Sequence, residues 1–291
     1  MTRITMFLAL TAATRTLMAA EGPFFITYTH QLEEPGNLEI ATKNVIGKPA
    51  DGNAFLGSAL EFEYGLKGWW TTEFYLDGQA TRRDSAVFTG YRWENRFRVL
   101  AREHWINPVL YLEFENINGA DKDLLEIVNH DGRDDLTTPN GDARREKKRE
   151  IEAKLILSSY FQGWTVAENF IAEKNVRHAP FEFGYAAGVS RPLALTARPE
   201  RCNLCPENFQ LGVEMYGGLG THDTFGLQGT SHYVAPTIAW TLSSGATFRI
   251  SPGFGVTDPS ARFLLRFGAS YEIEQFGRAV RNLFSAGSAR Q

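Results

Sequence analysis

The sequence has very little cysteine and no apolar run long enough to form a transmembrane helix. Only two of its 291 residues are cysteine, Cys202 and Cys205, so a small scaffold held together by many disulfides is excluded. Beyond the N-terminal region, no apolar stretch approaches the roughly 20 residues that a membrane-spanning helix needs. If this chain lies in a membrane, it must therefore cross it as strands.

An excess of charge of one sign is also missing. The chain has 30 basic and 34 acidic residues and a formal net charge of −4, which argues against nucleic acid as a partner. Hydrophobic residues make up 43% of the chain, which is typical of a folded protein rather than a disordered one. Glycine and phenylalanine are abundant, at 27 and 21 residues, and this combination favours packed strands over helices.

The first twenty residues have the features of a secretory signal. Arg3 precedes a short apolar run, and small residues lead up to Ala20. We therefore predict a signal peptide at 1–20 and an N-terminal periplasmic segment at 21–36; a short buried or interfacial helix is the alternative for the first of these. In an exported chain, Cys202 and Cys205 are compatible with a local disulfide or with two free thiols, whereas a zinc site would need two further ligands that are not nearby.

Large apolar residues alternate with charged ones along most of the chain, as the stretch 59–78 illustrates: Leu60 and Phe62 alternate with Glu61 and Glu63. This period of two is typical of strands, and turn-forming residues separate the alternating windows. The predicted strands are 37–46, 55–66, 69–79, 86–100, 108–117, 150–161, 164–174, 181–191, 208–217, 232–242, 246–256 and 262–273. About twelve antiparallel strands of this length predict an all-β, up-and-down transmembrane barrel over 37–273.

Alternation alone does not decide which face of the strands meets water. A soluble barrel would turn the apolar face inward, but about twelve strands close a cylinder too wide for one layer of apolar side chains to fill. A membrane barrel turns that face to lipid and leaves the charged face inside. The predicted lumen-lining residues are Glu61, Glu63, Glu73, Arg92, Arg96, Glu113, Glu115, Glu214, Arg249 and Arg266.

The tryptophans support the same orientation, because five of the six fall at strand ends that share one rim in an up-and-down barrel. An indole ring favours the headgroup region, so we predict an interfacial aromatic girdle at this rim. Its members are Trp69, Trp70, Trp105, Trp164 and Trp240. The longest connection, 118–149, leaves the opposite rim, which indicates that the tryptophan rim is periplasmic.

No catalytic, cofactor-binding or metal-binding residue is predicted. Ser231 and His232 are consecutive and would point to opposite faces of a strand, so they cannot form the dyad of an outer-membrane lipid hydrolase. Three aspartates in the 118–149 connection, Asp131, Asp134 and Asp135, could bind calcium but lack the spacing of a helix–loop–helix calcium site, and a solvated charged loop is the simpler interpretation.

Both ends of the chain resemble the bacterial outer-membrane family named for a MetA pathway of phenol degradation. The resemblance lies in "GPFFITYTHQLEEPGNLEIA" near the N-terminus, in "GVEMYGGLG", and in "ISPGFGVTDPSARFLLRFGASYEI" at the last hairpin. It implies a transporter-like outer-membrane β-barrel, but neither a defined substrate nor catalytic residues. The chain departs from many outer-membrane barrels in its C-terminal extension, 274–291, where we predict a short helix over Gln275–Phe284.

The sequence therefore predicts an outer-membrane barrel of a Gram-negative bacterium, exported through its signal peptide. The expected function is a passive channel or transporter for small molecules, hydrophobic or aromatic ones included. Two alternatives remain open, a lipid-modifying hydrolase of the outer membrane and a non-conducting surface or adhesin barrel. The expected partners are outer-membrane lipid and a small-molecule solute, with no nucleic acid.

Overall fold

The computed structural model describes residues 22–48, 52–121, 137–176, 180–196 and 202–280. Most of them are strand. The strands are β1 (Leu38–Gly47), β2 (Phe55–Lys67), β3 (Trp70–Thr81), β4 (Ala86–Arg98), β5 (Asn107–Asn118), β6 (Lys147–Phe161), β7 (Trp164–Asn175), β8 (Glu182–Pro192), β9 (Phe209–Thr221), β10 (His232–Thr241), β11 (Ala246–Gly255) and β12 (Phe263–Ile273). The prediction of twelve strands is confirmed, since the breaks between alternating windows mark the same turns.

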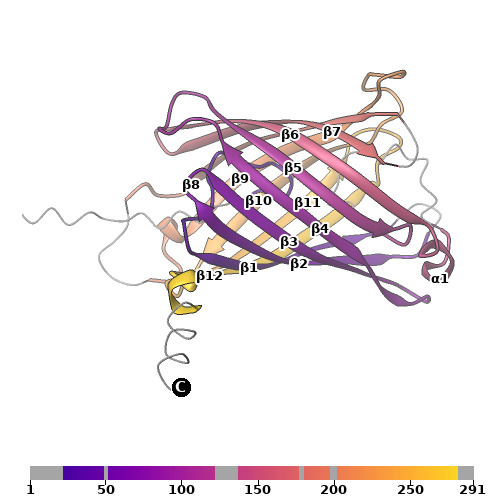
Figure 1. Cartoon of the computed structure of the whole chain (residues 1–291), viewed down its shortest axis with the longest axis horizontal. Helices are drawn as coiled ribbons and strands as arrows, with labels where there is room; N and C mark the ends of the chain where they lie inside the picture. The colour runs from indigo at the N-terminus through magenta and orange to yellow at the C-terminus, as the bar shows by residue number, and fades with distance from the viewer. Residues whose placement is uncertain (1–21, 49–51, 122–136, 177–179, 197–201, 281–291) are drawn as a thin grey trace, which may run out of the picture.

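The twelve strands form one closed antiparallel barrel (Figure 1). Each strand pairs with its neighbours in the sequence, and β1 pairs with β12 from Leu38 opposite Ile273 to Gly47 opposite Leu264. Closure leaves no unpaired sheet edge, which is the condition a strand protein must meet in hydrocarbon, where water cannot satisfy backbone N–H and C=O groups. No helix among the described residues is long and apolar enough to cross a membrane.

The two faces of the barrel differ in the way that the alternation indicates. On β2 and β3, Leu60, Phe74 and Leu76 are exposed on the outside, while Glu61 and Glu73 are buried inside. Large apolar side chains therefore cover the outer wall, and charged ones line the interior. This distribution is the reverse of a soluble barrel and fits a wall solvated by lipid.

The N-terminal segment lies inside the barrel. Residues 22–33 are buried with the exception of Tyr28 and Gln31, which are half-buried, and they contact strands on both sides of the lumen. Gly22 approaches Ser190 near the end of β8, and the segment leaves the lumen at Gly36, whose backbone N–H donates to Gly65 O. Both points lie at the rim where β1 begins, so the segment enters and leaves by the same end. The sequence places 21–36 in the periplasm as a segment separate from the barrel; the structure instead makes 22–33 part of its interior.

Short elements flank the two ends of the barrel. Helix α1 (Asn140–Ala143) lies in the connection before β6, and a single 3-10 turn, η1 (Pro206–Asn208), precedes β9. Residues 276–280 are helical and lie beside the start of β1 and the end of β12 in Figure 1. They cover part of the predicted C-terminal helix; Gln275, the predicted start of that helix, is a turn residue, and residues 281–284 lie outside the described residues. Gly277 N–H donates to Gly36 O, which joins this helix to the base of the N-terminal segment.

Candidate functional site: the plugged lumen

The predicted lumen residues are all buried on the inner face of the wall. Arg96 of β4 is the centre of the largest group. Its guanidinium lies 2.5 Å from Glu63 and 3.2 Å from Glu94, and it also pairs with Glu73. Buried carboxylates are stable only when cations and hydrogen bonds compensate them, so this arrangement ties β2, β3 and β4 together from the inside.

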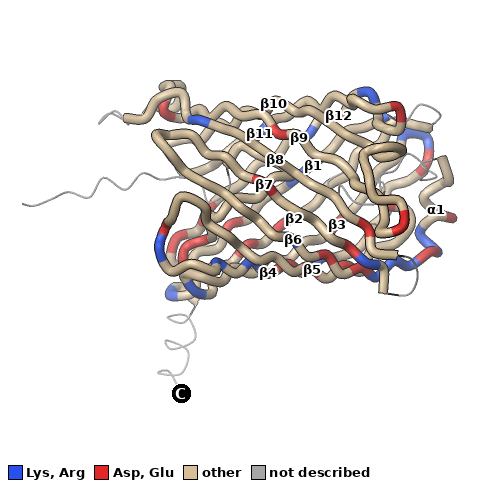
Figure 2. The backbone as a smooth tube through the Cα atoms, turned by 90° about the horizontal axis from the view of Figure 1, so that it is seen from above, with Lys and Arg blue, Asp and Glu red and all other residues tan. Residues whose placement is uncertain are grey.

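Three further cations compensate the same side of the lumen. Arg92 pairs with Asp77 at 3.1 Å and approaches Glu113 at 3.7 Å. Lys43 lies 2.9 Å from Glu61, and Lys154 lies 2.7 Å from Glu152. The interior of β1–β6 is therefore a lattice of alternating charge, and Figure 2 shows that charged positions are far sparser along the middle of β8–β12.

Two groups of carboxylates have the spacing of a metal site. They are Glu61, Glu63 and Glu73 in one group and Glu113, Glu115 and Glu152 in the other, and within each group the ligand atoms lie within 4.8 Å of one another. The cations that pair with both groups, including Arg96 and Lys154, already supply the positive charge that a metal would bring. We therefore assign these carboxylates to the wall of the lumen and not to a metal.

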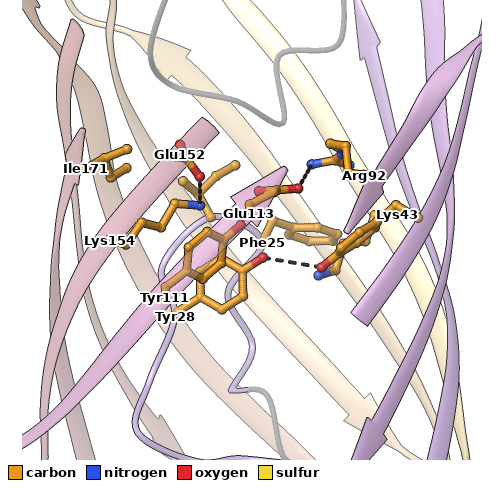
Figure 3. A pocket seen from close by; sticks show the side chains of 11 residues that line it. Phe25, Tyr28, Lys43, Arg92, Tyr111, Glu113, Glu152, Lys154 and Ile171 are labelled. Carbon is orange, nitrogen blue, oxygen red and sulfur yellow. Dashed lines mark hydrogen bonds and ion pairs between the residues drawn. The ribbon is translucent and has the colours of Figure 1, made fainter. Parts of the chain in front are cut away.

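Tyrosines connect the lattice of charge to the N-terminal segment. Tyr28 packs edge-on against Tyr111 at 5.3 Å between ring centroids, and its hydroxyl donates to Glu94 at 3.0 Å. Tyr75 also donates to Glu94, at 3.0 Å. The ammonium of Lys154 lies 4.8 Å from the Tyr28 ring, where the face of the ring attracts a cation. Figure 3 shows Tyr28 of the segment and Tyr111 of the wall side by side in the lumen.

Glu214 of β9 anchors the first part of the segment. The backbone N–H groups of Phe25, Ile26 and Thr27 all donate to its carboxylate, at 3.1, 3.0 and 3.0 Å, and the Thr27 hydroxyl adds a fourth contact at 3.2 Å. An irregular segment has backbone donors that no sheet satisfies, and a carboxylate is a strong acceptor for them. Glu214 therefore fixes the segment to the wall opposite Arg96.

Three polar side chains anchor the rest of the segment. Asn169 of β7 accepts from Tyr28 N–H at 2.7 Å and donates to Tyr28 O at 2.9 Å, as a neighbouring strand would. Ser158 accepts from His30 N–H at 2.8 Å, and Arg98 donates to His30 O at 3.0 Å. Burial of His30 lowers the pKa of its imidazole, so this side chain is neutral at neutral pH.

An apolar cluster occupies the other side of the lumen. Phe25 and Ile26 of the segment share it with wall residues from seven strands, β1, β2, β7, β8, β9, β10 and β12. The wall members are Val45, Phe55, Ile171, Ala186, Tyr216, Tyr233, Ala235 and Leu264. The lumen therefore has two chemically distinct walls, a charged one and an apolar one, and the N-terminal segment contacts both.

Little space remains around the segment in the middle of the lumen, whereas a cavity of about 280 Å³ lies beside His30 and Gln31, next to Arg102 and Glu103. The cavity in Figure 3, lined by Tyr28, Lys43, Arg92 and Lys154 among others, has a volume of about 20 Å³, and a second one beside Phe24 and Arg96 has about 10 Å³. Each is about the size of a single water molecule. Residues 22–33 therefore form a plug, the name used for them below, which fills the middle of the barrel.

The tryptophans predicted as a girdle lie near one rim, at or beside the ends of β2, β3, β5, β7 and β10. Trp69 and Trp105 are among the most exposed apolar side chains, and Trp164 is also exposed. They join other rings on the outer wall, since Trp105 packs on Phe161 and Trp240 stacks between Phe209 and Phe248. Trp70 and Trp240 are half-buried. Aromatic side chains near one rim are what an interfacial belt requires, and the girdle itself stays a prediction.

Other candidates of the sequence are placed as follows. Cys202 and Cys205 form a disulfide at the same rim as the tryptophans. The aspartates 131, 134 and 135 lie outside the described residues. His232 contacts Tyr185 and Thr230 through its ring, and its backbone N–H donates to Ser260. Among the described residues a Ser–His side-chain pair does occur inside the barrel: the ring of His30 contacts the hydroxyl of Ser158, which is 2% exposed.

Sequence reasoning missed the plug and several of its partners. Lys43 and Asn169 are isolated polar residues at inward positions of their strands, and the alternation of β1 and β7 was the signal that could have found them. Tyr75 and Tyr111 carry the same signal, because each lies two residues from an inward carboxylate. The plug itself has no alternation that distinguishes a luminal segment from a periplasmic one.

Comparisons with known proteins support the fold. No protein-family model matches the chain, and no curated protein matches it either. The structure is similar to a COG4313 outer membrane channel from Pseudomonas putida F1, with a TM-score of 0.52, 11% identity, and 83% of this chain and 97% of that chain covered. It is also similar to a KdgM porin in complex with disordered oligogalacturonate, with a TM-score of 0.50, 8% identity, and 80% and 98% covered. At these identities the likeness shows that the chain has the fold of an outer-membrane barrel.

Proposed function

We propose that this protein is a passive channel for small molecules in the outer membrane of a Gram-negative bacterium, and that the plug closes it. The observation that carries the proposal is the plugged lumen itself. A charged interior inside an apolar outer wall is the arrangement of a water-filled barrel, and here one segment of the chain fills it through non-covalent contacts alone. Conduction then requires the plug to leave or to shift.

The position of the plug makes such a movement feasible. Both of its ends lie at one rim, so it can withdraw without passing through the barrel. The wall does not depend on it for hydrogen bonding, since every strand is paired with two neighbours. We place this rim in the periplasm because the longest connection, 118–149, leaves the opposite rim. Residues 1–20 are then the export signal.

The charged wall supports a role in selectivity. Lys43, Arg92, Arg96 and Lys154 alternate with carboxylates around β1–β6, and rings of charge of this kind set which solutes enter a pore. The apolar cluster on the opposite wall supports solutes with a hydrophobic or aromatic part. The resemblance of both chain ends to the family named for a MetA pathway of phenol degradation agrees with such a solute, and we propose that the chain is related to that family.

A catalytic function is not proposed. The Ser158–His30 pair faces the lumen, away from the lipid on which a membrane hydrolase acts, and its hydroxyl is occupied by the backbone of the plug. A weaker likeness to LpxR from Salmonella typhimurium, with a TM-score of 0.40, 14% identity, and 81% and 99% covered, carries no argument for catalysis.

Deletion of residues 22–33 tests the proposal. In planar lipid bilayers we expect the full-length chain to be mostly closed and the deletion variant to conduct steadily, because the deletion empties the middle of the lumen. Its folding is checked independently by the electrophoretic test described in the Discussion. A folded deletion variant that does not conduct would overturn the proposed function.

A further inference from the structure

The barrel wall is interrupted at one seam. Between β10 and β11 the pairing runs through Tyr233 opposite Gly255 and Val234 opposite Phe254, and it resumes only at Ile238 opposite Ile250. Residues 235–237 and 251–253 therefore have no partner across this seam. Each of the other pairings among the described strands is continuous or skips a single residue.

Two prolines cause the interruption. The register of the flanking pairs places Pro236 of β10 opposite Pro252 of β11. In an antiparallel ladder, residues opposite each other in such a position exchange two N–H···O bonds, but proline has no N–H. Both bonds are lost together, so the nearest cross-strand bonds lie at the 234/254 and 238/250 pairs, about 13 Å apart along the strands.

Each proline remains paired with the strand on its other side. Pro236 still lies opposite Val213 on β9, and Pro252 lies opposite Leu265 on β12. Each proline thus turns its missing donor toward the other one. Proline inside a membrane-spanning ladder is unfavourable because it leaves a carbonyl without its donor, and two facing each other make this the weakest part of the described wall.

Small side chains line the inner side of the seam. Ala235, Thr237, Ser251 and Gly253 alternate with the prolines, and all four are buried. The hydroxyl oxygens of Thr237 and Ser251 have no hydrogen-bond partner within the described part of the chain. No large side chain at these four positions covers the unpaired stretch from the inside. Side chains of the neighbouring strands, Tyr216 of β9 and Arg266 of β12, lie against Gly253 instead, and two hydroxyl oxygens beneath the stretch are unsatisfied.

The gap connects two apolar regions. On the inside, Ala235 belongs to the cluster that Phe25 and Ile26 of the plug occupy. On the outside, Ile250 and Phe254 are exposed beside the prolines and face the same environment as the rest of the outer wall. An apolar molecule that replaces Phe25 in the cluster would reach the outer surface without crossing the charged wall of β2–β6.

We propose that the β10–β11 seam is a lateral passage through which an apolar solute moves between the lumen and the lipid of the outer membrane. The inference rests on the proposed channel function and names a solute class and a route for it. When the plug moves, the solute binds the apolar cluster, and the strands separate between the 234/254 and 238/250 pairs, where no cross-strand bond has to break. Polar solutes and ions keep to the axis of the barrel.

Restoring the missing donors tests the passage. The double variant Pro236→Val/Pro252→Val can form both cross-strand hydrogen bonds, and valine suits an outward strand position. The probe is N-phenylnaphthylamine, an apolar fluorophore, and its uptake is measured in whole cells that produce the full-length chain or the 22–33 deletion. We expect the valine substitutions to lower uptake about tenfold in either background, because opening the seam now breaks two backbone hydrogen bonds. Pro108→Val on β5, where the ladder is continuous, is the matched control and leaves uptake unchanged.

A reversible cross-link gives a second, independent measurement. Thr237→Cys/Ser251→Cys places two inward cysteines across the gap, and oxidation should block uptake until a reductant is added. The control, Ala41→Cys/Ser270→Cys, joins two inward residues that lie opposite each other on the continuous β1–β12 seam. Single-channel conductance of the same variants reports on the axis of the barrel and should not change.

The outcomes separate the two proposals. Unchanged uptake after both the valine substitutions and the oxidised 237/251 cross-link overturns the lateral passage and leaves the channel intact. An equal loss of uptake with the control cross-link also overturns it, because any stiffening of the barrel would then suffice. Uptake no greater than in cells without the protein, for both the full-length and the deleted chain, overturns it as well. A folded deletion variant that does not conduct overturns the channel itself.

Discussion

At the scale of single residues, the plug depends most on Glu214. One buried carboxylate accepts three consecutive backbone N–H groups, which is the anion-binding arrangement of a backbone nest. Hydrogen bonds to a charged acceptor are worth roughly 1.5–3 kcal/mol each in proteins, about twice the neutral value. Glu214 also lies on the apolar side of the lumen, so the plug backbone is the group that makes its burial acceptable.

We expect Glu214→Gln to loosen the plug without unfolding the barrel. The amide keeps the shape of the side chain but loses the charge and one acceptor oxygen, which should weaken docking by about 2 kcal/mol and raise the open fraction about 30-fold. Planar-bilayer recordings measure this change. Glu168→Gln on β7 is the matched control, because Glu168 is exposed on the outer face of the barrel and has no contact with the plug. An effect of equal size in both variants would show that the change is one of net charge.

At the scale of the element, the base of the plug carries a cluster of carboxylates. Burial, together with the nearby charges of Glu272 and Glu39, raises the pKa of Glu33 to about 8. The carboxyl group is therefore neutral when the plug is docked at neutral pH. Asn37 bridges this cluster to the C-terminal helix, since its side chain donates to Glu272 and accepts from Gln275 N–H.

The raised pKa of Glu33 predicts that docking of the plug weakens at alkaline pH. The free carboxyl has a pKa of 4.5, so the contribution to docking is full below that value and is lost as the pH rises through about 8. We expect the open probability in planar bilayers to increase between about pH 7 and 9, where Glu33 ionises beside two like charges. Glu33→Gln should remove this increase, while Glu34→Gln, at the neighbouring exposed position, should retain it. A pH profile that Glu33→Gln leaves unchanged would contradict this assignment.

At the scale of the whole molecule, closure by β1 and β12 joins all the strands into one hydrogen-bonded ring. Opening such a ring exposes two sheet edges at once, which is costly in lipid or detergent. The internal ion pairs between β2, β3 and β4 add a second set of links across the strands. Unfolding should therefore be slow and concerted.

We expect the protein to migrate differently in SDS gels before and after boiling, because the closed barrel binds less detergent and stays compact until heat opens it. The shift should persist in the presence of a reductant, since the Cys202–Cys205 disulfide has a sequence separation of only 3 and joins no strand to another. The 22–33 deletion should also keep the shift, because the strands pair without the plug. Equal mobility of boiled and unboiled samples would contradict closure.

The wall of this protein could be predicted from the sequence almost completely, whereas its contents could not. Alternation at Glu61, Glu63 and Glu73 determines which face is polar, because the period of a strand is fixed by its backbone. Turn residues between the windows determine where strands end. The number of strands then excludes an apolar interior, so the orientation of the wall follows from local chemistry and simple geometry.

Only the tertiary structure decided what occupies the lumen and where the wall is weak. The contacts between Phe25 and Glu214 span 189 residues, and no local pattern encodes such a pairing. The same holds for Pro236 and Pro252, because each marks a missing donor in its own strand but only the register of β10 and β11 places them opposite each other. Periodicity depends on a residue's neighbours in the chain, while the plug and the seam depend on which strands meet, and that is settled only when the barrel closes.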